Sequence, residues 1–299
     1  FDLVRAIVAR WGAAAAGIGD DAAVLDVPAG RQLVASVDSA TEGIHFRRDW
    51  LTPREIGWRA AAAALSDLAA MAAAPLAILV SLGLPRSWIA DLPAIADGLG
   101  EAAMATGARI AGGDLSAARD LTLAITVLGV TASPLRRSGA RPGDLLYVTG
   151  RLGGPVAALR AWQRGDTPSP ASRARFAHPV PRVREAQWLA AHGARAGIDI
   201  SDGLLSEAAH LAAASSAALD LTLDALPTYD GLSPDDASRS GEEYELLVAA
   251  AQPIDAHEFE RTFGLAITRI GRVAAGPARV TAQLHGARVA PNGGFDHFS

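Results

Sequence analysis

Carboxylates recur beside glycine or serine in this sequence, and their grouping indicates metal-assisted chemistry. Asp20 and Asp21 are adjacent, follow Gly17-Ile18-Gly19 and precede an apolar run. Neighbouring carboxylates repel each other unless water or a cation screens them, and Mg²⁺ prefers such oxygen ligands. Others stand at expected strand or helix ends, namely Asp38, Glu42, Asp67, Asp114, Asp199, Asp202, Glu242 and Glu243. If these segments converge, several Mg²⁺ ions and a polyphosphate would balance the negative charge.

These acidic residues also have structural explanations. Gly and Asp are common in turns, so the first pair could simply mark a turn before a strand. Asp202 could cap a helix, and Glu242 could belong to a solvated loop. Asp67 is harder to explain in this way, because it lies in an apolar helical segment where a free carboxylate would be poorly solvated.

Two glycine-rich stretches are suited to phosphate binding. Gly112-Gly113-Asp114 and the segment 150–154 are expected to be turns after strands, where backbone N–H groups can approach a phosphate. No Gly-Lys-Ser/Thr follows either stretch, and no Gly-x-Gly-x-x-Gly opens a helix. A kinase built on this chain would therefore need a nucleotide site of another type.

Composition narrows the class of protein. The chain has 299 residues, 50% of them apolar, a formal net charge of −5 and no cysteine. Disulfides and thiolate metal sites are excluded, and the absence of a basic stripe argues against a nucleic-acid partner. No apolar run reaches membrane-spanning length, and residues 1–11 predict an amphipathic helix instead of a secretory signal. We therefore expect a cytoplasmic protein.

The elements that must position the carboxylates alternate irregularly between strands and helices. Thr52-Pro53-Arg54-Glu55 predicts a helix start, with Thr as N-cap and Glu three residues later. A change of composition over 131–143 suggests a domain boundary, giving domains 1–136 and 137–299. The pattern predicts an α+β fold of mixed layers instead of a doubly wound sheet. Further expected elements are strands at 22–27, 32–37, 77–84, 108–111 and 121–130, a helix at 88–106, and a long loop at 164–181.

Taken together, the motifs resemble thiamine-monophosphate kinases of the aminoimidazole-ribonucleotide-synthetase-like superfamily. They occur in that family's order and span nearly the whole chain. They are the segments 17–24, 38–46, 65–71, 112–114, 137–144, 199–204, 241–246 and 294–298.

The resemblance implies two mixed α/β domains with the active site in the cleft between them. The N-terminal one would bind ATP and Mg²⁺ and supply a sheet that forms a barrel across a homodimer. The C-terminal one would close the cleft. The implied reaction moves the γ-phosphoryl group of ATP in line onto thiamine monophosphate, giving thiamine diphosphate, with ATP as co-substrate and several Mg²⁺ ions as cofactors.

The resemblance also implies roles for individual residues. Metal ligands would be provided at Asp21, Ser36, Val37, Asp38, Asp67, Asp114, Asp199 and Asp202. Gly113, Asp114, Arg137 and Ser201 would contact ATP, and Arg137 would assist the metal-dependent transfer without any general base. His45, Glu242 and Phe295 would contact the thiamine phosphate.

Some positions depart from the family pattern. Ala64, Leu115, Arg239-Ser240 and Glu243 stand where the family usually has Asn, Thr, Ser-Gly and Asp, and Val37 stands where Thr is common. These departures leave open a catalytically weak protein that binds nucleotide and Mg²⁺. Aminoimidazole-ribonucleotide synthetase is the other enzymatic alternative, and a purely structural dimer module would leave the many acidic residues unexplained.

Overall fold

The computed structural model describes residues 2–16, 18–19, 21–229 and 231–290. Its contacts divide the chain into two compact units. The first comprises Phe1–Leu68, Ala73–Pro134 and Ala177–Val183, and the second comprises Ala69–Ala72, Leu135–Phe176 and Arg184–Ser299. Short segments around 70 and 180 thus belong to a different unit from their sequence neighbours.

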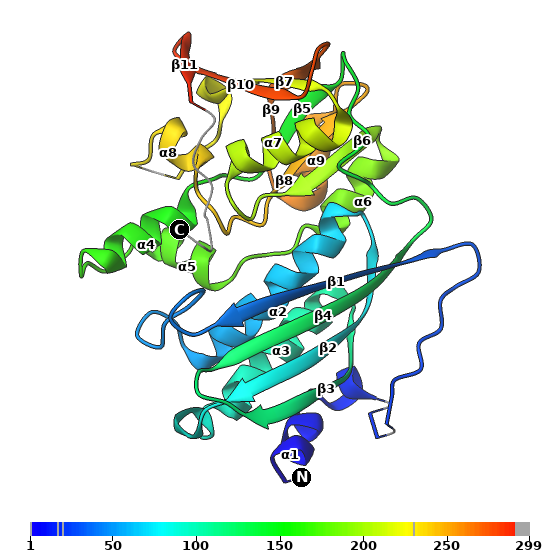
Figure 1. The fold of residues 1–299 in the computed structure, drawn as a ribbon, viewed down its shortest axis with the longest axis vertical. Coiled ribbons are helices and arrows are strands. Elements are labelled where there is room, and N and C mark those ends of the chain that lie inside the picture. Colours follow the sequence, from blue (N-terminus) through cyan, green and yellow to red (C-terminus); the bar gives the residue numbers. More distant parts are fainter. Residues whose placement is uncertain (1, 17, 20, 230, 291–299) are drawn as a thin grey trace. The chain divides into compact units, whose positions relative to one another are not determined.

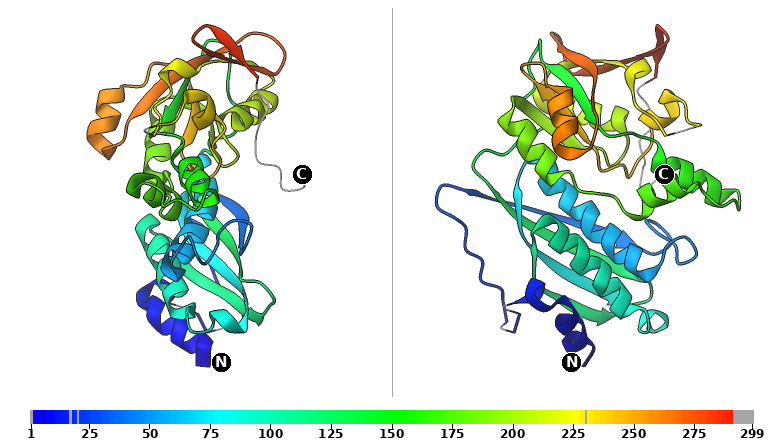
Figure 2. Two further views of the ribbon diagram at one scale, coloured as in Figure 1. Left: turned by 90° about the vertical axis from the view of Figure 1, so that its left-hand side faces the viewer. Right: turned by 180° about the vertical axis from the view of Figure 1, so that it is seen from behind.

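The first unit is a four-stranded sheet with helices on one face (Figures 1 and 2). The strand order is β1-β4-β2-β3, and only the β2–β3 pair is parallel. Helices α2 and α3 cover the face on which Leu123, Ile125 and Val127 of β4 are buried. The elements are α1 (Asp2–Trp11), β1 (Gln32–Thr41), α2 (Pro53–Ala70), β2 (Ala74–Leu84), α3 (Leu92–Thr106), β3 (Arg109–Ala117) and β4 (Thr122–Thr131).

Helix α2 begins where the sequence predicts. The Thr52 hydroxyl accepts the backbone N–H of Glu55 at 3.3 Å, and the Glu55 carboxylate accepts the backbone N–H of Thr52 at 2.8 Å. This reciprocal capping satisfies two N–H groups at the helix start. Further along, Gly57 of α2 and Gly98 of α3 let the two backbones approach each other. A Cβ at Gly57 would lie 2.0 Å from the carbonyl oxygen of Ile95.

The opposite face of this sheet carries exposed apolar side chains. Successive residues of a strand point to opposite faces, so Leu33 and Val37 of β1 point away from the helices. They are 51% and 64% exposed. The sheet is open within one chain, and no closed barrel forms in the described residues.

The second unit is a seven-stranded sheet covered by helices on both faces. Its order is β11-β10-β7-β9-β5-β8-β6, with β10–β7 the one parallel pair among the pairings described. Helix α7 packs on the face formed by Leu146, Val148 and Leu247, and α6 and α9 pack on the face of Tyr147 and Val248.

The strands of this unit are β5 (Leu145–Thr149), β6 (Ala194–Asp199), β7 (Ala218–Thr222), β8 (Leu246–Ala250), β9 (Ile267–Ala274), β10 (Arg279–Leu284) and β11 (Ala287–Val289). The helices are α4 (Gly154–Gln163), α5 (Pro170–Ala177), α6 (Val183–Ala191), α7 (Leu204–Ser215), α8 (Pro234–Ser238) and α9 (Ala256–Phe263). Both units mix strands and helices, as the α+β prediction requires. In the part of the chain described, no helix is both long and apolar enough to cross a membrane.

Three local predictions were wrong. Residues 22–27 form no strand, because no neighbouring strand pairs with them, and Val24 is 86% exposed. The expected turn at Gly112-Gly113-Asp114 lies inside β3. A Cβ at Gly113 would lie 1.9 Å from the carbonyl oxygen of Val80, so this glycine serves close strand packing. The expected loop 164–181 contains α5, whose start is capped by the Ser169 hydroxyl accepting the Ser172 N–H at 3.2 Å.

Candidate active site

Strand β1 and helix α2 bring together one group of predicted metal ligands. Ser36 and Asp38 are two positions apart on β1 and therefore point to the same face of the sheet. This is the face that α2 covers, because Ser36 contacts Asp67 of α2. The Ser36 hydroxyl donates a hydrogen bond of 2.5 Å to the Asp67 carboxylate, which α2 contributes. Asp38 accepts the backbone N–H of Ser39 at 2.7 Å. Val37 points to the other face, so only its backbone could face this group.

Strand β3 positions Gly113 and Asp114 differently. Gly113 lies in the same cross-strand row as Asp38, whereas Asp114 lies in the adjacent row with Ser81. Adjacent rows of a pleated sheet point to opposite faces, so the Asp114 side chain is not gathered with Asp38. Asp21 is exposed in the segment before β1. Among the described residues, no three His, Asp or Glu side chains are grouped closely enough to hold a metal ion.

His45 lies in the turn that follows β1. Its Nδ1 accepts the backbone N–H of Thr41 at 3.1 Å, which in the neutral ring leaves the proton on Nε2. Gly43 has a φ of 83°, which suits glycine and allows the turn to close between Glu42 and Phe46. The Glu42 carboxylate accepts the indole N–H of Trp88 at 2.8 Å, so this acidic residue helps to fix the turn.

In the second unit, the predicted residues Asp199, Ser201 and Asp202 connect β6 to α7. Asp199 ends β6 and is 4% exposed. The Glu207 carboxylate accepts the Ser201 hydroxyl and the Asp202 backbone N–H, both at 3.2 Å. Burial raises the pKa of Glu207. The N-cap of α7 is Gly203, and no side chain caps this helix, so Asp202 is not a capping residue.

Glu242 lies directly beside Ser201. Its backbone N–H donates to the Ser201 carbonyl oxygen at 2.5 Å, and the N–H of Tyr244 donates to Ile200 at 2.8 Å. Glu242 and Tyr244 have φ values of 61° and 50°, in the left-handed region that non-glycine residues rarely adopt. The structure thus joins a predicted substrate residue to a predicted ATP residue within one unit.

Arg137 is not brought to Ser201. Its carbonyl oxygen accepts the Ser215 hydroxyl at 2.6 Å, which places it at the C-terminal end of α7. Ser201 precedes the N-terminal end of the same 12-residue helix, and such a helix is about 18 Å long. Phe295 lies outside the described residues, as do Gly17 and Asp20 of the opening motif.

Arg175 and Glu245 are among the buried charged residues of the second unit that sequence reasoning did not single out. Arg175 of α5 is 7% exposed and pairs with Glu245, which is 1% exposed. Arg175 has no local sequence signal, because only tertiary packing buries it, and Glu245 belongs to the motif segment 241–246 but has no predicted role. Glu243 stands in the sequence both as one of the recurring acidic residues and as a departure from the family pattern, and it is fully buried beside Arg175.

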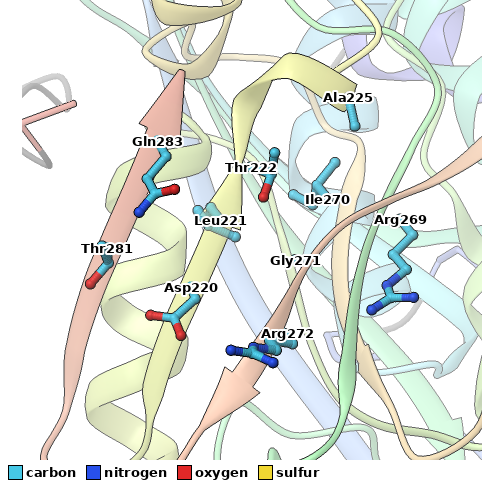
Figure 3. Close-up of a pocket in the computed structure, with 10 residues that line it drawn as sticks. All are labelled: Asp220, Leu221, Thr222, Ala225, Arg269, Ile270, Gly271, Arg272, Thr281 and Gln283. Atoms are coloured by element: carbon cyan, nitrogen blue, oxygen red, sulfur yellow. The ribbon is translucent and has the colours of Figure 1, made fainter. Parts of the chain in front are cut away.

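A pocket of about 600 Å³ lies over β7, β9 and β10 (Figure 3). A register shift beside Gly271 places the side chains of Arg269 and Arg272 on the side of the sheet that faces the pocket, while Ile270 packs in the core. Asp220, Thr222, Thr281 and Gln283 also line it. None of the predicted site residues is among those that line this pocket.

Comparison with known proteins assigns the family. Residues 19–131 match the family described as AIR synthase related protein, N-terminal domain, and residues 141–282 match its C-terminal domain. The thiamine-monophosphate kinase of Mycobacterium tuberculosis is 38% identical over 278 residues, covering 88% of this chain and 80% of the relative. The chain belongs to the thiamine-monophosphate kinase family.

Solved structures agree with this family. The crystal structure of thiamine-monophosphate kinase from Stenotrophomonas maltophilia has a TM-score of 0.85 at 35% identity, covering 97% of each chain. AaThiL complexed with AMPPCP and TMP has a TM-score of 0.80 at 28% identity, covering 99% of this chain and 95% of that one.

Proposed function

We propose that this chain phosphorylates thiamine monophosphate with ATP, giving thiamine diphosphate and ADP. The observation that carries the proposal is the similarity, over 99% of this chain, to AaThiL complexed with AMPPCP and TMP. In the reaction, a phosphate oxygen of thiamine monophosphate forms a bond to the γ-phosphorus as the bond to the ADP oxygen breaks. The acceptor oxygen is already largely deprotonated near neutral pH, so no general base is needed.

The oxygen donors of the chain fit Mg²⁺. Asp38, Asp67 and the Ser36 hydroxyl offer hard oxygen ligands on one face, and Asp199 and Asp202 offer two more beside α7. Asp21, the backbone of Val37 and Asp114, whose side chain lies on the other face of the sheet from Asp38, complete the proposed set. Bound Mg²⁺ would neutralise charge between the two phosphate-bearing reactants. The Ser36 hydrogen bond would orient the Asp67 carboxylate, as partners of metal ligands commonly do.

The remaining proposed residues bind the two substrates. The Glu242 carboxylate suits the cationic thiazolium ring, and Phe295 would offer an aromatic face to it. The Nε2–H of His45 can donate to the phosphate of thiamine monophosphate, because Nδ1 is held by Thr41. Gly113, Asp114 and Ser201 are proposed to contact ATP. Arg137, at the far end of α7 from Ser201, is proposed to contact a part of ATP remote from Ser201.

We also propose a homodimer formed through the open face of the four-stranded sheet. The exposed Leu33 and Val37 on β1 support this, because soluble proteins seldom leave an apolar sheet face uncovered. A barrel would then be completed by two sheets, one from each subunit. The proposed domain roles are ATP and Mg²⁺ binding with dimerisation for 1–136, and closure of the site for 137–299. We propose the cytoplasm as its location.

ADP release measured against a panel of acceptors tests the proposal. Purified protein with ATP and Mg²⁺ should release ADP with thiamine monophosphate, and not with free thiamine or an aminoimidazole precursor. Omitting Mg²⁺ should abolish the signal. Nucleotide binding without ADP release would favour the catalytically weak alternative, for which Ala64, Leu115 and Glu243 are the motivating substitutions.

A further inference from the structure

We propose that Arg175 is a positioning residue that holds Glu242 in place for the thiamine end of the substrate. The inference rests on the proposed function, since it takes Glu242 as the carboxylate beside the thiazolium ring. It assigns a role to a residue of α5 that does not itself contact the substrate. The role is carried by a buried ionic cluster, defined here as Arg175, Glu243, Glu245 and Thr149.

The cluster fixes the backbone on both sides of Glu243. An Nη2–H of Arg175 donates to the backbone oxygen of Glu243, and the same nitrogen lies 2.9 Å from the Glu245 carboxylate. The other Glu245 oxygen accepts the Thr149 hydroxyl at 2.6 Å. One guanidinium therefore ties main chain and side chain of a single short segment, 243–245, to α5.

The segment needs such support because its backbone is strained. Glu242 and Tyr244, on either side of Glu243, both have left-handed φ values. Non-glycine residues persist in this region only when surrounding structure over-determines them. The backbone hydrogen bonds from Glu242 to Ser201 and from Tyr244 to Ile200 hold part of this segment in place. The buried ionic cluster holds the rest.

The cluster also connects this segment to the glycine-rich turn before α4. The Glu243 carboxylate accepts the backbone N–H of Gly153. A Cβ at Gly150 would lie 2.6 Å from the Glu245 carboxyl carbon, and one at Gly154 would lie 2.7 Å from Cγ of Arg175. These glycines are therefore explained by packing against buried charges, which is a different use from phosphate binding.

The length and planar shape of arginine fit this position. The planar guanidinium offers donors in several fixed directions, and lysine offers one compact charge. Arg175 uses one nitrogen for both a carbonyl and a carboxylate, while its Nε lies 3.6 Å from the Glu243 carboxylate. Lysine would keep the positive charge in the cluster, but its side chain is one atom shorter and its ammonium could not lie where Nη2 contacts both Glu243 and Glu245. The segment 241–245 should then lose its fixed position.

The test compares R175K with wild type and with R160K, a control in which an exposed arginine of α4 is changed. Steady-state kinetics give KM for each substrate separately, and hydrogen–deuterium exchange reports on the peptide that contains 241–245. We expect R175K to raise KM for thiamine monophosphate about tenfold. KM for ATP should rise much less, because Ser201 is held independently by Glu207, and exchange of the peptide should increase. R160K should match wild type in all three.

Unchanged KM for thiamine monophosphate and unchanged exchange in R175K would overturn the positioning role, as would an equal rise in both KM values. If R175K does not fold, E243Q is measured instead, because it keeps the shape of the side chain and places an NH₂ group toward Arg175. It should shift the same two readouts in the same direction. A wild-type protein that turns over no substrate would instead contradict the proposed function, while exchange would still decide the role of Arg175.

Discussion

The contact between Ser36 and Asp67 links strand β1 to helix α2 at a single carboxylate. If Asp67 is a metal ligand, D67N should reduce Mg²⁺-dependent turnover roughly 100-fold or more, because the amide removes the negative charge but keeps the shape. Thermal unfolding should change little, since Asn can still accept the Ser36 hydroxyl. ADP release at saturating substrates measures the effect.

The matched control for this substitution is D166N, which removes an exposed carboxylate that pairs with Arg164. It should retain wild-type turnover and show the same Mg²⁺ dependence. Wild-type turnover in D67N at low Mg²⁺ would remove Asp67 from the set of metal ligands.

Glu243 should make stability depend on pH. Burial raises the pKa of Glu243 from 4.5 to about 7. The Arg175 guanidinium and the Gly153 N–H oppose this rise, and the Glu245 carboxylate adds to it. The Tyr229 hydroxyl also lies close enough to interact with Glu243. The folded state then holds a proton that the unfolded state has lost between these two values. Stability contributed by this group therefore falls as pH rises from about 4.5 to 7, by up to a few kcal/mol.

Urea unfolding of wild type and E243Q at pH 5 and pH 8 measures this effect. Because glutamine does not titrate, the free energy of unfolding of the variant relative to wild type should be higher at pH 8 than at pH 5. Parallel pH dependence in the two proteins would show that Glu243 is ionised throughout.

At the scale of single residues, sequence reasoning found the residues with strong local signals and missed those that only packing reveals. Asp67 was singled out because its apolar neighbours leave a carboxylate poorly solvated, and the structure gives it a partner in Ser36. Arg175 has no such signal, because Glu243 and Glu245, the residues buried beside it, lie about seventy residues away in sequence.

At the scale of elements, the close approach of α2 and α3 depends on glycine. A Cβ at Gly98 would lie 1.9 Å from the carbonyl oxygen of Arg54, and Gly57 faces Ile95 in the same way. G57A and G98A should each lower the free energy of unfolding by about 2 kcal/mol or more, because backbone atoms must move apart. A105S, on an exposed position of α3, should change it by less than about 0.5 kcal/mol.

Chemical denaturation of G57A, G98A and A105S measures these changes in the free energy of unfolding. Equal midpoints for G98A and A105S would mean that the two helices can separate at little cost. The expected outcome is a clear loss for the glycine variants alone.

Element prediction succeeded where capping chemistry is local and failed where pairing decides. The Thr52–Glu55 signal placed the start of α2 correctly, since both hydrogen bonds lie within four residues. Residues 22–27 have the composition of a strand but pair with no neighbouring strand. Gly113 looks like a turn in sequence, yet β2 holds it in an extended strand.

At the scale of the whole molecule, the exposed face of β1 predicts self-association. L33E should weaken the proposed homodimer, because a carboxylate would be buried between two apolar sheet faces. Sedimentation velocity across a range of concentrations measures the change. M104E, which alters an exposed apolar residue on α3, should leave the dimer intact. A wild-type protein that sediments as a monomer at every concentration would contradict the proposed assembly.

The proposed reaction is tested most directly by the products formed from thiamine monophosphate and ATP. Mass spectrometry and ³¹P NMR of a completed reaction should detect thiamine diphosphate and ADP in equal amounts, with no free phosphate above background. ADP with equal free phosphate and no thiamine diphosphate would contradict phosphoryl transfer to thiamine monophosphate, and would indicate a hydrolase or a synthetase instead.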